Sequence, residues 1–161
     1  MHDNLPFRQR MKKAVMLGLA IGLMLWWSPG LRAEKLIFFV DAVRENRIDD
    51  VKELLKSGAD VNAKDMFGGN TGLHWSARLG LAEMARLLIE NGADPNARND
   101  DNDTPLHWAA REGQKELVVI LLAHRAKVNA VGKAGWTPLR WAEAQGHKDL
   151  ARILVAAGAQ H

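Results

Sequence analysis

The chain has 161 residues, of which 47% are hydrophobic and 25% charged, as in a soluble folded domain and unlike a disordered chain. The net charge of +3 comes from residues 1–33, which carry five basic residues and one acidic residue. The remainder of the chain carries 17 basic and 18 acidic side chains. This balance excludes the basic surface that nucleic-acid binding needs, and the absence of cysteine excludes disulfides and zinc–thiolate sites.

Residues 1–33 have the layout of a bacterial-type secretory signal peptide. Lys12 and Lys13 supply a positive start, Ala14–Trp27 is an uncharged and mostly apolar stretch, and Leu31-Arg32-Ala33 offers a cleavage site after Ala33. A helix of those 14 apolar residues would span about 21 Å, less than the roughly 30 Å of a membrane core. We therefore expect residues 1–33 to be removed on export to the periplasm or beyond. An uncleaved amino-terminal anchor is the alternative, and either Met1 or Met11 is the start.

From residue 70 onward the sequence repeats itself at a constant interval. Residues 70–77, 103–110 and 136–143 read Asn-Thr-Gly-Leu-His-Trp-Ser-Ala, Asp-Thr-Pro-Leu-His-Trp-Ala-Ala and Trp-Thr-Pro-Leu-Arg-Trp-Ala-Glu. A second block, Gly-Ala-Asp-Val-Asn-Ala at 58–63, recurs at 92–97 and, degraded, at 125–130. A 33-residue period opened by Thr-Pro-Leu-His resembles the ankyrin repeat, and the resemblance covers roughly residues 35–161.

The resemblance implies an all-α fold, an ankyrin-repeat solenoid of stacked helix–turn–helix pairs with short β-hairpin fingers. Each unit buries its apolar face against its neighbours, so stability comes from stacking. We expect one domain at residues 34–161. It would consist of an amino-terminal capping repeat at 35–66 followed by repeats at 67–99, 100–132 and 133–161.

Each repeat carries the local signals of a short first helix. The threonine of each block, at positions 71, 104 and 137, can cap this helix, and Pro105 and Pro138 suit the first helical position. Gly72 replaces that proline in the second unit and should loosen the helix start slightly. Gly80, Gly113 and Gly146 are expected to end the helix in the left-handed conformation, with Asn46 in their place in the first unit.

No constellation of residues predicts catalysis, so we expect no enzyme activity and no cofactor. The resemblance implies that His74 and His107 form structural hydrogen bonds, and Arg140 takes the third equivalent position. Stacked helices lie about 8–10 Å apart, too far for equivalent histidines to share a zinc ion at about 2 Å, so we expect no metal. The remaining candidates of this kind are expected on the surface: His124, His147 and His161.

Asp100, Asp101 and Asp103 form an acidic cluster without the glycine and glutamate of a calcium-binding loop. We therefore expect a solvated hairpin tip there. The column of tryptophans, Trp75, Trp108 and Trp141, is expected to pack between repeats, with a ligand-stacking platform as the alternative.

The resemblance implies binding of a protein partner through the finger tips and the concave face of the first helices. The apolar finger residues are of types enriched at interfaces, although Phe67 and Trp136 have packing on adjacent fingers as an alternative. The candidate partner-binding residues are Met66, Phe67, Arg78, Leu79, Asp100, Asp101, Asp103, Arg111, Glu112, Lys133, Trp136 and Gln145.

The function expected from these features is that of an exported, monomeric protein–protein interaction module, such as a periplasmic adaptor. The alternative is an inhibitor or immunity protein, or a secreted effector, that binds one specific target enzyme or host protein. We expect no nucleic-acid partner, and contact with a membrane only through the signal peptide.

Overall fold

The computed structural model describes residues 38–160, which belong to the unit Lys35–His161. The predicted signal peptide and its cleavage site lie outside the described residues. Within residues 38–160, no helix is long and apolar enough to cross a membrane.

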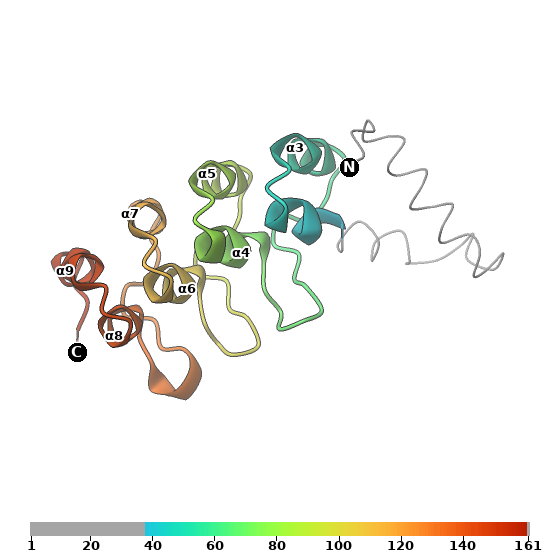
Figure 1. Ribbon diagram of the computed structural model, residues 1–161. Coiled ribbons are helices and arrows are strands. Elements are labelled where there is room, and N and C mark those ends of the chain that lie inside the picture. Colours follow the sequence, from blue (N-terminus) through green and yellow to red (C-terminus); the bar gives the residue numbers. More distant parts are fainter. Residues whose placement is uncertain (1–37, 161) are drawn as a thin grey trace, which may run out of the picture. The chain divides into compact units, whose positions relative to one another are not determined.

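Four helix–turn–helix pairs stand side by side, with the first helix of each pair in an inner row and the second in an outer row (Figure 1). The inner row consists of a helix at 38–44, α4 (Gly72–Leu79), α6 (Pro105–Arg111) and α8 (Pro138–Ala144). The outer row consists of α3 (Ile48–Lys56), α5 (Ala82–Glu90), α7 (Lys115–Ala123) and α9 (Lys148–Ala156).

In the inner row α4 packs on α6 and α6 on α8, and each of these three helices packs on the outer helix of its own pair. Loops connect the pairs and project from the inner row; the last contains a short 3-10 turn, η2 (Lys133–Gly135). The predicted all-α solenoid is confirmed. The described residues form no β-strand and contain one isolated β-bridge, between Lys64 and Thr71.

The predicted starts and ends of the inner helices are confirmed. The threonines at 71, 104 and 137 are the N-caps, with extended backbone, and a proline opens both α6 and α8. Gly80, Gly113 and Gly146 have φ of 73°, 73° and 75°, and Asn46 has a φ of 53°. These positive angles let the chain reverse into the outer helix.

The structure shows why a glycine stands at position 72, which the sequence alone did not reveal. The residue is buried, and a Cβ atom added to it would lie 3.2 Å from Val43 and 3.3 Å from Leu88. The start of α4 is therefore tightly packed against the 38–44 helix and α5. The predicted slight loosening of the helix start stays a prediction.

The core consists of columns of equivalent apolar side chains, one from each repeat. Phe39, Leu73, Leu106 and Leu139 form the column of the inner row, and each is at most 1% exposed. Leu88, Leu121 and Leu154 form a matching column of the outer row, each fully buried. No repeat could bury these side chains alone, so the apolar contact between neighbours stabilises the whole stack.

An asparagine in each connecting turn forms hydrogen bonds to the next repeat. The side chain of Asn96 accepts a bond of 2.8 Å from the Lys127 amide and donates one of 3.1 Å to the Arg125 carbonyl. Asn62 and Asn129 make the equivalent pairs of bonds one repeat earlier and one repeat later. We call these three residues the asparagine seam.

A polar side chain of the following repeat covers the end of α4 and of α6. Gln114 lies so close to Gly80 that an added Cβ would be 2.7 Å from its side-chain oxygen, and His147 covers Gly113 at a similar distance. His147 also donates from Nε2 to the Arg111 carbonyl at 3.0 Å. This histidine is half-buried between repeats, so its placement on the surface was wrong.

Candidate functional site

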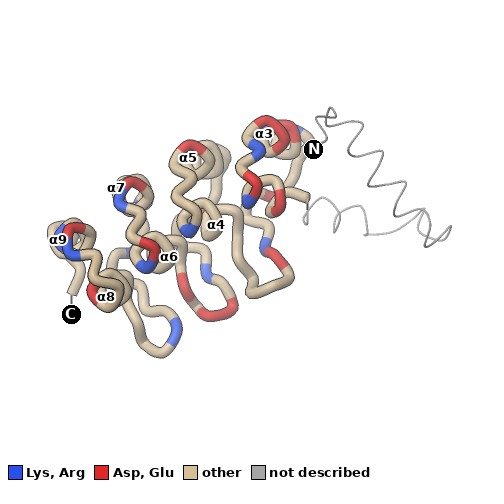
Figure 2. The backbone as a smooth tube through the Cα atoms, in the orientation of Figure 1, with Lys and Arg blue, Asp and Glu red and all other residues tan. Residues whose placement is uncertain are grey.

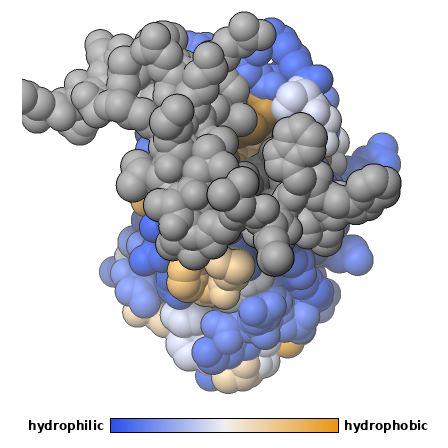
Figure 3. All heavy atoms as spheres, turned by 90° about the vertical axis from the view of Figure 1, so that its right-hand side faces the viewer, coloured by the Kyte–Doolittle hydropathy of each residue, from blue (hydrophilic) through white to orange (hydrophobic). Residues whose placement is uncertain are grey.

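Three finger loops project from the inner row, and we define them as finger one (residues 65–70), finger two (residues 99–103) and finger three (residues 132–136). Finger one carries the most exposed large apolar side chains of the described chain, Met66 at 75% and Phe67 at 84%. Viewed from the side that lies on the right in Figure 1, the visible described surface is otherwise mostly hydrophilic, with small separate hydrophobic areas (Figure 3). The tip of finger one is thus an apolar contact point.

Asp65 fixes the backbone beneath this tip. Its carboxylate accepts bonds of 3.1 Å from the amides of Phe67 and Asn70, and one of 2.8 Å from the indole nitrogen of Trp75 on α4. Partial burial acts to raise the pKa of Asp65, but these hydrogen bonds outweigh it and hold the pKa below its ordinary value. Finger one is therefore pinned to α4 through a charged acceptor.

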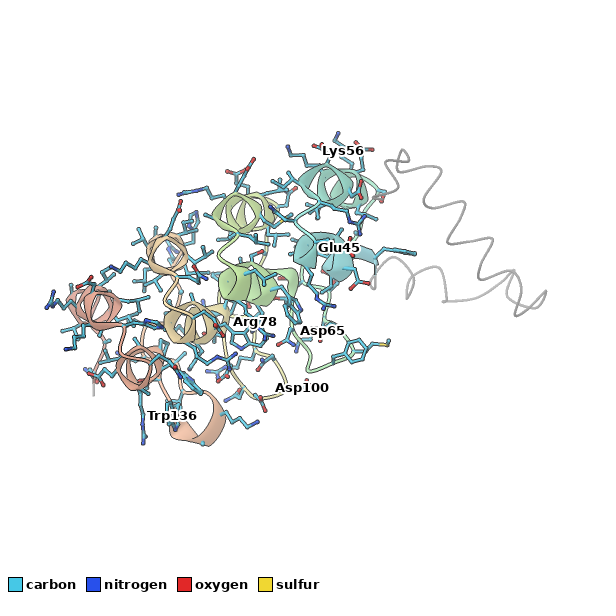
Figure 4. The ribbon with its side chains drawn as sticks, viewed as in Figure 1. Glu45, Lys56, Asp65, Arg78, Asp100 and Trp136 are labelled. Atoms are coloured by element: carbon cyan, nitrogen blue, oxygen red, sulfur yellow. The ribbon has the colours of Figure 1, made fainter. Side chains whose placement is uncertain are left out.

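Fingers one and two are joined along their length. The Asp100 amide donates to the Gly68 carbonyl at 2.9 Å, and the Asn99 side chain donates to that of Asn70 at the same distance. Figure 4 shows Asp65 and Asp100 on these two neighbouring fingers, with Arg78 above them on α4 and Trp136 on finger three. Preorganised fingers of this kind lose little conformational freedom on binding.

The acidic cluster divides into two parts. Asp100 and Asp101 are exposed, and Asp101 pairs with Lys133 of finger three at 2.8 Å. Asp103 is only 4% exposed, and its carboxylate accepts a bond of 3.1 Å from the Lys133 amide. The expectation of a solvated position and a partner contact at Asp103 was wrong, because this side chain enters finger three and holds its backbone.

The finger tips differ in charge along the array, from acidic at finger two to basic at finger three (Figure 2). Trp136 is half-buried, with its ring centre 4.4 Å from that of Trp141 and the Arg140 guanidinium 4.8 Å above it. It therefore packs on α8 of its own repeat and leaves one part of its indole accessible.

The inner helices carry a row of alternating arginine and tryptophan side chains, here called the Arg–Trp row. The Arg78 guanidinium carbon is 5.3 Å from the Trp75 ring centre and 5.5 Å from that of Trp108. Arg111 lies 5.5 Å from both Trp108 and Trp141. The first member is Arg44, 4.6 Å from Trp75.

The Arg–Trp row confirms that the tryptophans pack between repeats. Trp75 meets Trp108 edge-to-face at 5.6 Å. Arg78 and Arg111 were among the candidate residues, but Arg44 was not. Arg44 nevertheless stands two residues before Asn46, just as Arg78 stands two residues before Gly80. This register was the signal that could have revealed it. The other candidates beside the row are exposed: Leu79, Glu112 and Gln145.

His74 and His107 link each inner helix to the next finger. Nδ1 of His74 accepts the Thr71 amide proton at 3.2 Å, so the ring carries its proton on Nε2 and donates it to the Asp103 carbonyl at 3.0 Å. His107 repeats this arrangement with Thr104 and the Trp136 carbonyl. Burial lowers the pKa of both rings, that of His74 to about 4, and outweighs the bonds to the carbonyls.

These histidines have no nitrogen left for a metal or a substrate, which confirms their structural role. Across the described residues 38–160, no three His, Cys, Asp or Glu side chains are grouped so that they could hold a metal ion.

Comparison with known proteins agrees with this architecture. The family model "Ankyrin repeats (3 copies)" matches residues 39–131 and 73–161. A protein phosphatase 1 regulatory subunit 27 from Homo sapiens is 43% identical over 65 residues, which is 40% of this chain and 42% of that protein. The ankyrin repeat domain-containing protein 49 of Drosophila melanogaster is 45% identical over 69 residues, 42% of this chain and 31% of that protein.

The B-cell lymphoma 3 protein homolog of Mus musculus is 42% identical over 66 residues, covering 41% of this chain and 14% of that protein. The chain thus spans less than half the length of each of these relatives. The family model, in contrast, covers nearly all of the described residues. With its regular sequence period, its row of helix pairs and its histidine-linked fingers, the chain belongs to the ankyrin repeat family.

Proposed function

We propose that this chain is an exported, non-enzymatic module that binds a protein partner through its finger tips and inner helices. Ankyrin repeats mediate protein–protein interaction. The observation that carries the proposal is the pairing of exposure with rigidity at finger one, where Phe67 is 84% exposed on a backbone held by Asp65. An aromatic side chain presented in this way is well suited to anchor an interface.

The proposed surface extends from finger one across the other tips and up the inner helices. Exposed carboxylates on finger two and the Lys133 ammonium on finger three give it a charge pattern that a partner must complement. The rigidity of the joined fingers favours, as a second candidate, an inhibitor, immunity protein or effector with one specific target. An adaptor for several partners gains less from a preformed surface.

The export part of the proposal is supported by residues 11–33 and by the balanced charge of the remainder. Cell fractionation followed by intact mass measurement tests it directly. A periplasmic or secreted chain beginning at Glu34 supports the proposal. A chain that stays in the cytoplasm with residues 11–33 attached contradicts it.

Cross-linking at finger one tests partner binding. A photoreactive benzoylphenylalanine placed at position 67 of the full chain is expected to form a covalent adduct with the partner in the producing cells. The same group at Val119, which is 54% exposed on the outer helix α7, is the matched control and should give no adduct of that mass. Equal adducts at both positions would contradict a specific interface at finger one.

Removal of the apolar tip should then weaken the identified complex. The Met66→Ser/Phe67→Ser variant is expected to bind the partner at least about tenfold more weakly, because a buried aromatic anchor contributes about 2 kcal/mol or more. Its thermal midpoint should stay that of the parent, since both side chains are exposed. Val119→Ser/Val155→Ser also replaces two exposed apolar side chains by serine, here on the outer helices, and should leave the affinity unchanged.

A further inference from the structure

The Arg–Trp row contains one guanidinium whose charge is not matched. Arg44 pairs with Asp41 at 3.3 Å, and Arg111 pairs with Glu112 at 3.2 Å. Arg78, between them in the row, has no carboxylate within ion-pair distance among the described residues, and its side chain is exposed. It therefore presents free N–H donors to the surface.

The two neighbouring indoles prepare Arg78 for a bidentate ligand. They restrict the guanidinium through cation–π contacts at 5.3 and 5.5 Å, and the donors around its rim remain available. A planar guanidinium that is already ordered loses less entropy when it binds, and its fork of donors matches the two oxygens of a carboxylate.

An open pocket of about 430 Å³ lies beside this guanidinium. Within it, the carboxylates of Asp41 and Glu45 are already paired, the first with Arg44 and the second with Arg47 at 2.8 Å. Arg47 also pairs with Asp50, so the local charges balance, but Arg78 is the charged lining residue without an ion pair of its own among the described residues. The apolar wall next to it is Leu79, 45% exposed. The full lining consists of Asp41, Arg44, Glu45, Trp75, Arg78 and Leu79.

We infer that Arg78 binds a carboxylate of the protein partner, presented by an extended acidic segment whose neighbouring apolar side chain contacts Leu79. This inference rests on the proposed function and specifies the partner's chemistry. It concerns the inner helices, and the fingers would hold a separate part of the same partner.

The spacing of the row indicates which segment fits. Arg44, Arg78 and Arg111 occur once per repeat, and packed helices are about 8–10 Å apart. An extended chain advances about 3.3 Å per residue, so acidic residues three positions apart repeat at about 10 Å. Arg44 and Arg111, on either side of Arg78 in the row, have solvent-accessible ion pairs, which are weak in water, so carboxylates of the partner can replace their present acceptors.

The test uses a fluorescein-labelled peptide of three Glu-Leu-Ser triplets and a control peptide of three Gln-Leu-Ser triplets, titrated with the full chain and followed by anisotropy. The Glu peptide is expected to bind at least about tenfold more tightly than the Gln peptide, because its carboxylates accept charge-assisted hydrogen bonds that a neutral amide does not form. Equal binding of the two peptides, or no binding of either, would overturn the inference.

Two substitutions of Arg78 locate the effect. Arg78→Ala should weaken Glu-peptide binding about tenfold or more, and Arg78→Lys should recover only part of the loss because an ammonium lacks the planar fork. Arg86→Ala, which removes an exposed arginine from the outer helix α5, is the matched control and should bind as the parent does. Parent-like affinity in Arg78→Ala contradicts the inference, and the Lys variant serves if the Ala variant fails to fold.

The outcomes separate this inference from the proposed function. If the partner cross-links at position 67 and binds Arg78→Ala with parent affinity, the proposed function holds and the acidic-segment inference fails. If binding of the Glu peptide depends on Arg78 while position 67 yields no specific adduct, the inference holds and the finger surface does not anchor the partner.

Discussion

Acidification from pH 7.5 to 4.5 is expected to lower the free energy of unfolding by about 2.5 kcal/mol through His74 alone. In the folded chain the pKa of His74 is lowered to about 4, chiefly by burial, against an ordinary value of 6.5. Lys64 acts in the same direction, whereas Asp65 and Asp103 act in the opposite one. A protonated ring would lose the Thr71 amide bond, because its Nδ1 would no longer accept.

The direction of the effect follows from proton uptake in the two states. As the pH falls through 6.5, the unfolded chain takes up a proton on His74 while the folded chain does not, so unfolding becomes more favourable. The loss is complete near pH 4, where the folded ring also protonates. His107 adds a loss of the same sign, since burial lowers its pKa too. Stability from this source is fully present above the ordinary histidine pKa.

Urea unfolding followed by tryptophan fluorescence at several pH values between 7.5 and 4.5 measures this effect. His74→Gln removes the titrating group, so its stability should be lower at pH 7.5 and should change less with pH than that of the parent. His124→Gln, an exposed histidine in the cap of α7, should keep the parent profile. If the His74→Gln profile is as steep as the parent profile, another group causes the acid sensitivity.

Replacement of Gly132 by alanine is the second change with a large expected effect, a loss of about 2–4 kcal/mol. Gly132 has a negative φ of −107°, so alanine meets no backbone strain there. Its Cβ would, however, lie 2.0 Å from Oδ1 of Asp103 and 3.0 Å from Nε2 of His107. Finger three must then move away, which breaks the Lys133 amide bond to Asp103 and the His107 bond to the Trp136 carbonyl.

A double-mutant cycle identifies the cause of this loss. If the clash with the carboxylate dominates, Asp103→Ala/Gly132→Ala should be no less stable than Asp103→Ala alone. Gly135→Ala is the matched glycine control. Its φ is +77° and no atom lies within 4 Å of its added Cβ, so only about 1 kcal/mol of left-handed strain is expected. Thermal unfolding of the four chains measures the cycle, and strictly additive losses would contradict a steric origin.

Much of the fold was predictable because the signals that specify it are local and recur once per repeat. Thr104 followed by Pro105 starts a helix, and Gly113 ends it, whatever lies around them. Features that depend on a neighbouring repeat were not predictable. Gly72 was predicted to loosen its helix start slightly, but its close packing on Val43 and Leu88, far away in the sequence, was not foreseen.

In the candidate site, too, the local features were predictable and those that depend on a neighbouring repeat were not. The place of Phe67 at a finger tip was predictable, but its 84% exposure was not, because packing on an adjacent finger was an equal alternative. Asp103 was misplaced on the surface because its side chain crosses into finger three, where Gly132 leaves room for it. Of the Arg–Trp row, the sequence showed the column of tryptophans, and Arg78 and Arg111 only as separate candidate residues. Their alternation requires the offset between neighbouring helices, which a single repeat does not encode.

The two sets of hydrogen bonds between repeats also bear on how the array deforms under load. The histidine links join the inner helices to the next finger, whereas the asparagine seam joins the turns that follow the outer helices. Opening the array on one side would stretch one set and leave the other in place, so bending should be elastic and reversible. Pulling along the stack loads both sets together, and a single repeat should then detach abruptly, with its hydrogen bonds failing as a group.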